Sequence, residues 1–276
     1  MMNTCRRIKL IVFLLIVFVS LCGCKTINKL RTAQDTFNEA ASLDNQSSQV
    51  SYYNNVTPSE VSAAPIAPQD KSKLLYHETL EILDTIDDSG KTTLKKNKLY
   101  GNYLILKGLS YWKLDKNAEA TAVVAEAEKE TDNLIDRDKK LFEIMPSLIA
   151  LNEAKPYYVK STKHLDENCF NIKRITEIIT DEEIEPFDKI LNDRNENSNL
   201  RLYVAQCKLL AYFYQHKGYR FAASNKNSTC AATYINRFNA ADSAAKQTIK
   251  ELETIIKDIS NAKGIVPKWK HKFNFK

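Results

Sequence analysis

Apolar residues recur every three or four positions along most of this chain, which is the spacing of one face of an α-helix. The clearest stretch covers residues 231–260, and we expect it to form one long amphipathic helix. Pro146 should kink or interrupt the helix that contains it, because proline removes a helix hydrogen bond. The same spacing predicts helices over residues 25–43, 70–86, 94–114, 118–134, 136–154, 170–180, 186–191 and 200–223.

Polar segments separate these predicted helices. Residues 45–69 are rich in Ser, Asn and Pro without a helical period, so we interpret them as a loop or linker. Residues 87–90 and 115–117 predict turns, and residues 155–167 predict an irregular connection. The chain contains 6 Gly and 7 Pro, too few for the many tight turns of an all-β fold. The expected fold class is therefore all-α, with antiparallel helix pairs.

Composition narrows the class of protein and of partner. Hydrophobic residues make up 43% of the chain and charged residues 27%, which is typical of a globular protein. The formal net charge is +6, and the first 23 residues carry three basic and no acidic residues. A mature chain with so small an excess of positive charge lacks the concentrated basic face of a nucleic-acid-binding protein, so we expect no nucleic-acid partner.

The N-terminus carries the most specific pattern. A basic segment precedes an apolar run over residues 10–21. A bilayer takes about 20 apolar residues to cross, so the shorter run is typical of a secretory signal peptide. Residues 21–24 read Leu-Cys-Gly-Cys and resemble the lipobox of bacterial lipoproteins, in which an aliphatic residue and a small residue precede the lipidated cysteine.

The lipobox resemblance implies cleavage before Cys24 and acylation of its sulfur and amino group, which would anchor the mature chain in a bacterial envelope membrane. Lys25 follows instead of the Asp that retains enterobacterial lipoproteins at the inner membrane, which implies the outer membrane, facing the periplasm. Ordinary cleavage with release, or an uncleaved anchor, is the alternative. In an exported chain Cys169, Cys207 and Cys230 remain, and they form at most one disulfide or stay as buried thiols.

The stretch from Gly108 to Ala127 resembles a tetratricopeptide repeat, a helix pair of about 34 residues. Small residues at Gly108, Ala120 and Ala127 and the aromatic Tyr111 fall at the relative positions of that repeat, with its turn at residues 115–117. The physical reason for the small residues is the close approach of the two helices. The resemblance implies an α-solenoid, and a generic helical bundle is the alternative.

Two further segments match the repeat pattern in part. Residues 33–44 match its second helix. The residues at the later matching offsets are Ala211, Tyr214, Gly218 and Ala223.

In tetratricopeptide proteins the first helix of each pair lines a groove that holds a partner. The contact residues that the resemblance implies are Asn102, Ile105, Leu109, Trp112 and Lys113 in the first segment and Ala205, Lys208, Tyr212, Gln215 and His216 in the second. Trp112 and Tyr212 would be the main anchors, because aromatic side chains supply much of the binding energy at interfaces. A core position is the equal alternative for both.

No segment carries a complete catalytic or metal-binding motif. Residues 77–81 begin like a zinc-protease motif but lack its second histidine, and residues 89–92 end like a phosphate-binding loop but lack its first glycine. His164 lies near acidic residues and Cys169 in what we interpret as a solvated loop. The acidic run over residues 181–188 predicts an exposed surface. We expect no cofactor and no metal.

The sequence thus predicts a signal peptide over residues 1–23, a helix after the lipidated cysteine (24–44), a linker (45–69), a repeat-like helical domain (70–260) and a basic aromatic tail (261–276). The expected function is a non-enzymatic scaffold that holds a protein or peptide partner at the envelope. A ligand-binding accessory protein of a transport system is the second hypothesis, and an enzyme acting on peptidoglycan is the third. The tail either frays or contacts an anionic membrane surface.

Overall fold

The described part of the chain is entirely helical. A computed structural model describes residues 25–44, 68–161, 168–224, 229–259 and 264–275, and these contain helices but no strand. The predicted all-α class is therefore confirmed. The signal peptide, Cys24 and almost all of the predicted linker lie outside the described residues, as does His164.

The helices divide into two compact units, Met1–Phe142 and Glu143–Lys276. The first unit contains a helix over residues 25–44 followed by α2 (Pro68–Asp84), α3 (Asp88–Lys96), α4 (Tyr100–Lys113), α5 (Asn117–Lys129) and the start of α6 (Asp136–Ser161). The boundary falls within the predicted 70–260 domain and within α6.

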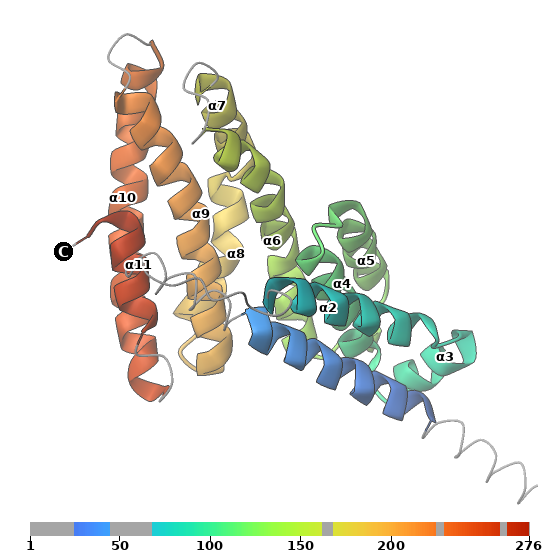
Figure 1. Cartoon of the computed structure of the whole chain (residues 1–276). Helices are drawn as coiled ribbons and strands as arrows, with labels where there is room; N and C mark the ends of the chain where they lie inside the picture. The colour runs from blue at the N-terminus through green and yellow to red at the C-terminus, as the bar shows by residue number, and fades with distance from the viewer. Residues whose placement is uncertain (1–24, 45–67, 162–167, 225–228, 260–263, 276) are drawn as a thin grey trace, which may run out of the picture. The chain divides into compact units, whose positions relative to one another are not determined.

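The α4–α5 hairpin confirms that the stretch from Gly108 to Ala127 forms two helices (Figure 1). The chain reverses through Asp115, whose φ of 57° lies in the left-handed region. Gly108 and Ala120 are buried where the helices pack, as the repeat pattern requires. Val123, rather than the neighbouring position 124, is the buried valine of α5. The solenoid that the repeat resemblance implies stays a prediction.

The single helix predicted over residues 94–114 is wrong, because the chain turns between α3 and α4. Lys98 has a φ of 56°, which no continuous helix accommodates. The polar residues at 87–90 begin α3: the Asp87 side chain accepts a hydrogen bond of 2.7 Å from the backbone N–H of Gly90. A capped helix start thus follows α2 directly.

The last residue of the helix over residues 25–44 joins that helix to α2 and α4 through hydrogen bonds and an ion pair. The Asp44 carboxylate accepts hydrogen bonds from Ser72 Oγ at 2.6 Å and Tyr76 Oη at 2.9 Å, and it pairs with Lys113 Nζ at 2.9 Å. The Phe37 ring packs against the Tyr76 ring with centroids 5.3 Å apart. These contacts make the N-terminal helix a packed part of the first unit.

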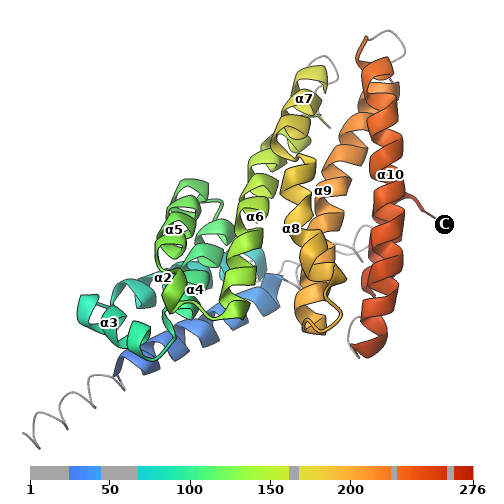
Figure 2. The same ribbon diagram turned by 180° about the vertical axis from the view of Figure 1, so that it is seen from behind.

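The second unit is built around α9. It contains the rest of α6, α7 (Asn168–Ile178), α8 (Asp181–Asn192), α9 (Ser198–Ser224), α10 (Thr229–Ile255) and α11 (Ile265–Phe273). Helices α9 and α10 run side by side along their length, and α7, α8 and α11 also pack against α9 (Figures 1 and 2). Its core includes Ile172, Tyr219, Tyr234 and Ala241.

The structure confirms one sequence expectation for this unit and corrects another. Helix α9 confirms the single helix predicted over residues 200–223. Helix α6 continues through Pro146 without a break and on to Ser161, into the segment expected to be irregular. Buried side chains on either side of the proline, such as Met145 and Leu148, hold the helix together.

The acidic run and the C-terminal tail are both helical. The acidic residues from Asp181 open α8, where Thr180 caps the helix and negative charge complements the helix dipole. The tail forms α11, which buries Val266, Trp269 and Phe273 against the second unit. The expected frayed tail is therefore wrong for residues 265–273, because their apolar face has a packing partner.

A candidate binding cavity in the second unit

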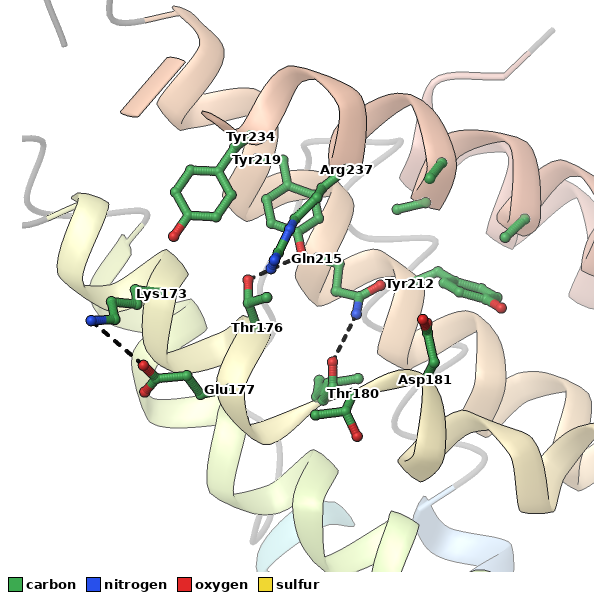
Figure 3. Close-up of a pocket in the computed structure, with 14 residues that line it drawn as sticks. Lys173, Thr176, Glu177, Thr180, Asp181, Tyr212, Gln215, Tyr219, Tyr234 and Arg237 are labelled. Atoms are coloured by element: carbon green, nitrogen blue, oxygen red, sulfur yellow. Dashed lines mark hydrogen bonds and ion pairs between the residues drawn. The ribbon is translucent and has the colours of Figure 1, made fainter. Parts of the chain in front are cut away.

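A cavity of about 690 Å³ opens between α7, α9 and α10 (Figure 3). Its lining comes from one face of each helix, because the residues recur at helical intervals. The lining residues are Lys173, Thr176, Glu177, Ile179, Thr180, Asp181, Tyr212, Gln215, Tyr219, Tyr234, Arg237, Ala240, Ala241 and Ala244. The three alanines leave space on α10, and the exposed residues Lys173, Thr180 and Asp181 place part of the lining at the surface.

Two stacked tyrosines form one wall of the cavity. Tyr219 of α9 and Tyr234 of α10 are buried, with ring centroids 5.4 Å apart and ring planes 13° apart. The Arg237 guanidinium lies 5.9 Å from the Tyr234 ring centroid, and it neighbours the Tyr219 hydroxyl, whose pKa its charge acts to lower. The two rings thus support the guanidinium from α10 at the edge of the core.

Hydrogen bonds give this wall a fixed donor direction. Thr176 donates its hydroxyl proton to the Ile172 carbonyl at 2.9 Å, so its oxygen accepts from the Tyr219 hydroxyl at 3.1 Å. Tyr219 has then used its only proton, so its oxygen can act only as an acceptor toward the neighbouring Arg237. Burial raises the pKa of Tyr219, which keeps the hydroxyl protonated for this role.

The charged residues of the lining differ in how they are neutralised. Lys173 pairs with Glu177 at 3.7 Å, and Glu177 also pairs with Arg174 at 2.8 Å. Arg237 and Asp181 have no ion pair among the described residues. The cavity therefore presents one guanidinium and one carboxylate, both on exposed residues, that form no ion pair with any described residue.

Two of the predicted partner-contact residues line this cavity. Gln215 donates from Nε2 to the Ile179 carbonyl at 3.0 Å, which orients its amide beside Thr180 (Figure 3). Tyr212 is half-buried, and burial together with the charges of Asp188 and Asp181 raises its pKa. Both side chains therefore offer neutral hydrogen-bonding groups to an occupant.

The other predicted residues of the later segment are engaged inside the unit. Lys208 is buried and paired with Asp188 of α8. His216 is 2% exposed, contacts Asp242 through Nε2 at 3.2 Å and packs on Phe238 and Phe273. Burial lowers the pKa of His216 despite the nearby Asp242. Ala205 is fully buried as well.

The predicted contact residues of the earlier segment belong to the first unit and do not join this cavity. Ile105 and Trp112 are buried, and Leu109 is half-buried. Asn102 accepts a hydrogen bond of 2.7 Å from Arg137. Lys113 lies over the Trp112 ring and pairs with Asp44, as described above. A partner-binding role for this face stays a prediction.

Sequence reasoning missed Thr176, Tyr219, Tyr234 and Arg237. Tyr234, Arg237 and Ala241 recur at intervals of three and four on α10, which is a signal that they share a helix face. The interval does not indicate which helix that face meets. That α7 and α10 both line one cavity beside α9 is a property of the folded unit.

Cys169 is disulfide-bonded, whereas Cys207 is a buried thiol. Over the described ranges, His, Cys, Asp and Glu side chains form no group that could hold a metal ion. In the same ranges no helix combines the length and the apolar character needed to cross a membrane.

Comparison of this chain with known proteins gives no match. No protein-family model, curated protein or solved structure matches this chain. The functional argument therefore depends on the residues and on the geometry described above.

Proposed function

We propose that this protein is a bacterial envelope lipoprotein, anchored through Cys24, that binds a segment of another polypeptide in the cavity between α7, α9 and α10. The observation that carries the proposal is the cavity itself, where Tyr212 and Gln215 meet polar groups from three helices. The lipobox resemblance supports the anchor. The Cys169 disulfide supports an exported location, because disulfides persist in oxidising compartments.

The character of the lining favours a polypeptide over a small apolar ligand. Small-molecule pockets are mostly apolar and enclose their ligand. This cavity is lined by tyrosine and threonine hydroxyls, an amide and four charged side chains, and several of these are exposed. Peptide backbones and polar side chains offer the matching donors and acceptors. The transport-accessory hypothesis would need a closed apolar cavity instead.

The acidic residues of α8 give little support to the peptidoglycan-enzyme hypothesis. Asp181, Glu182 and Glu185 are exposed. Glu183 is half-buried, and its burial, together with Glu153 and Glu182, raises its pKa. A glycosidase needs two carboxylates that face each other across a cleft. We therefore place a scaffold without enzymatic activity first.

Photo-crosslinking in intact envelopes tests the binding role. A photoreactive amino acid replaces Ala240, an exposed residue of the cavity lining, in the full chain. We expect one covalent adduct with a discrete polypeptide. The same amino acid at Lys250, exposed on α10 outside the cavity, is the matched control and should give none. Ala244→Phe should abolish the Ala240 adduct, because the larger ring fills the cavity.

The proposal fails if Ala240 and Lys250 give the same adducts, or if Ala244→Phe leaves the adduct unchanged in a chain with wild-type helicity. The anchor has a separate test. Cys24→Ala should remove metabolic labelling with a fatty acid and release the chain from membranes. A Cys24→Ala chain that remains acylated and membrane-bound would refute the lipoprotein assignment.

A further inference from the structure

We infer that the cavity recognises a carboxylate group of the bound polypeptide, with Arg237 as the residue that binds it. This inference rests on the proposed function and adds the chemistry of the partner. It follows from the position of the Arg237 guanidinium on the wall formed by Tyr219 and Tyr234, together with the charges around it.

The Arg237 side chain is positioned before any ligand arrives. The Tyr234 ring supports its guanidinium, and the neighbouring Tyr219 oxygen is available to it only as an acceptor, because Tyr219 donates its proton to Thr176. A guanidinium has five N–H donors in a planar fork, so one hydroxyl acceptor leaves most of them for a ligand. Holding the group in one place reduces the entropy that binding would otherwise cost.

The remaining charges make Arg237 the cation available to an anion. Lys173, the other cation of the lining, is already paired with Glu177. Among the described residues no carboxylate pairs with Arg237. An anion that enters the cavity therefore finds its unmatched positive charge at Arg237.

The surroundings favour a single carboxylate over a polyanion. The planar fork of arginine matches the two oxygens of a carboxylate. Asp181 and Glu177 also line the cavity, and their negative charges repel a ligand with repeated phosphates. Gln215, which lies between Arg237 and Asp181 in the close-up, and Tyr212, which lies beside Asp181, can bind the neutral peptide backbone (Figure 3). The carboxylate belongs either to an Asp or Glu side chain or to a C-terminus.

Binding of three synthetic peptides to the full chain, extracted in mild detergent, tests the inference and separates the two sources. All three are N-acetylated and carry the same fluorophore. The first is Ala-Ala-Glu-Ala-Ala with an amidated C-terminus, the second has Gln in place of Glu, and the third is the Gln peptide with a free C-terminal carboxylate. Fluorescence anisotropy measures the dissociation constants.

We expect at least one of the two carboxylate peptides to bind about tenfold or more tightly than the neutral peptide, as a charge-assisted hydrogen bond provides. Tighter binding of the first peptide assigns the side-chain source, and tighter binding of the third assigns the C-terminus. Arg237→Gln should remove the preference, and Arg237→Lys should retain only part of it. Lys250→Gln removes the same charge from the same helix outside the cavity and should change nothing.

Equal binding of the three peptides to the wild-type chain overturns the inference, as does absence of binding by all three. A preference that survives Arg237→Gln also overturns it. The Ala240 photo-adduct separates these failures from failure of the proposed function. An adduct that persists in Arg237→Gln while peptide selectivity is absent leaves the polypeptide-binding role standing and removes only the carboxylate chemistry.

Discussion

Replacing Asp44 with alanine should loosen the N-terminal helix from the first unit. Asp44 is the last described residue of the helix over residues 25–44, and its carboxylate joins that helix to α2 and α4. The substitution removes the acceptor of two hydroxyl groups, on Ser72 and Tyr76, and the ion-pair partner of Lys113. Ser72 is 1% exposed, so solvent does not replace its lost partner without rearrangement.

The size of the loss follows from the three interactions. The two hydrogen bonds from neutral hydroxyls contribute about 1 kcal/mol each, and the bond from the charged Lys113 contributes about 2 kcal/mol. The Asp44 and Lys113 side chains are only 24% and 27% exposed, so the ion pair is screened less than a pair in open solvent. We expect Asp44→Ala to lower the free energy of unfolding of the first unit by about 4 kcal/mol.

The effect should depend on pH. Burial by itself would raise the pKa of Asp44, but Lys113 and the hydrogen bonds outweigh it and lower the pKa. A carboxyl group with a lowered pKa stabilises the fold above its unfolded-state pKa of about 3.9, and this contribution disappears as pH falls through the folded-state value. Wild type and Asp44→Ala should therefore differ at pH 7 and converge in acid.

Hydrogen exchange followed by mass spectrometry, with urea titration, resolves the N-terminal helix from the rest of the chain. Peptides from residues 25–44 should lose protection in Asp44→Ala. Asp84→Ala is the matched control: Asp84 ends α2 and makes one ion pair with Lys107, and its side chain is 57% exposed. That control should cost less than about 1 kcal/mol. Equal losses in the two variants would refute the network argument.

Two further predictions concern packing and buried charge. Gly101→Ala should destabilise the first unit by about 2 kcal/mol or more in thermal melting, because the new Cβ would lie 2.0 Å from Oδ2 of the buried Asp138. Gly264→Ala is the control, because its new Cβ meets nothing within 4 Å, and its stability should stay within about 0.5 kcal/mol of wild type. Equal melting temperatures for the two variants would contradict the predicted clash between the new Cβ at position 101 and Asp138. Burial lowers the pKa of Lys272 to about 8, below its unfolded value, so the stability of the second unit should rise as pH climbs from about 8 to about 10.4. Lys272→Met should raise the stability of the second unit at pH 7 and flatten the increase of stability with pH. Lys270→Met, the control, removes a half-exposed partner of Glu253 and should give no gain in stability. A loss of stability in Lys272→Met at pH 7 would show that the folded state favours the charged form of Lys272.

The helical spacing of apolar residues predicted most of the local structure, and each wrong prediction has an identifiable physical cause. The α4–α5 turn was predicted because polar residues at 115–117 interrupt an apolar pattern. The turn between α3 and α4 was missed although Leu94 and Leu99 lie five positions apart, an interval that interrupts the helical spacing; no Gly or Pro marks the turn. The helix over residues 200–223 was predicted correctly because its apolar spacing runs on through Gly218.

The residues predicted to contact a partner also had different outcomes in the structure. The tetratricopeptide resemblance implied Tyr212 and Gln215 as contact residues, and both line the cavity. Trp112 was named by the same reasoning and is buried in the other unit. One helix face looks the same in sequence whether it meets a partner or the chain's own core, so periodicity cannot separate these outcomes.

The sequence by itself determined the all-α class and the positions of most helices, because helix formation depends on neighbours three and four residues apart. It also carries the lipobox prediction, which depends on a short linear motif. Only the tertiary structure decided which helix faces meet. It placed Arg237 beside Tyr219 and Tyr234. It also paired Lys113, which lies over the Trp112 ring, with Asp44. Such contacts join residues far apart in the chain, and local spacing holds no information about them.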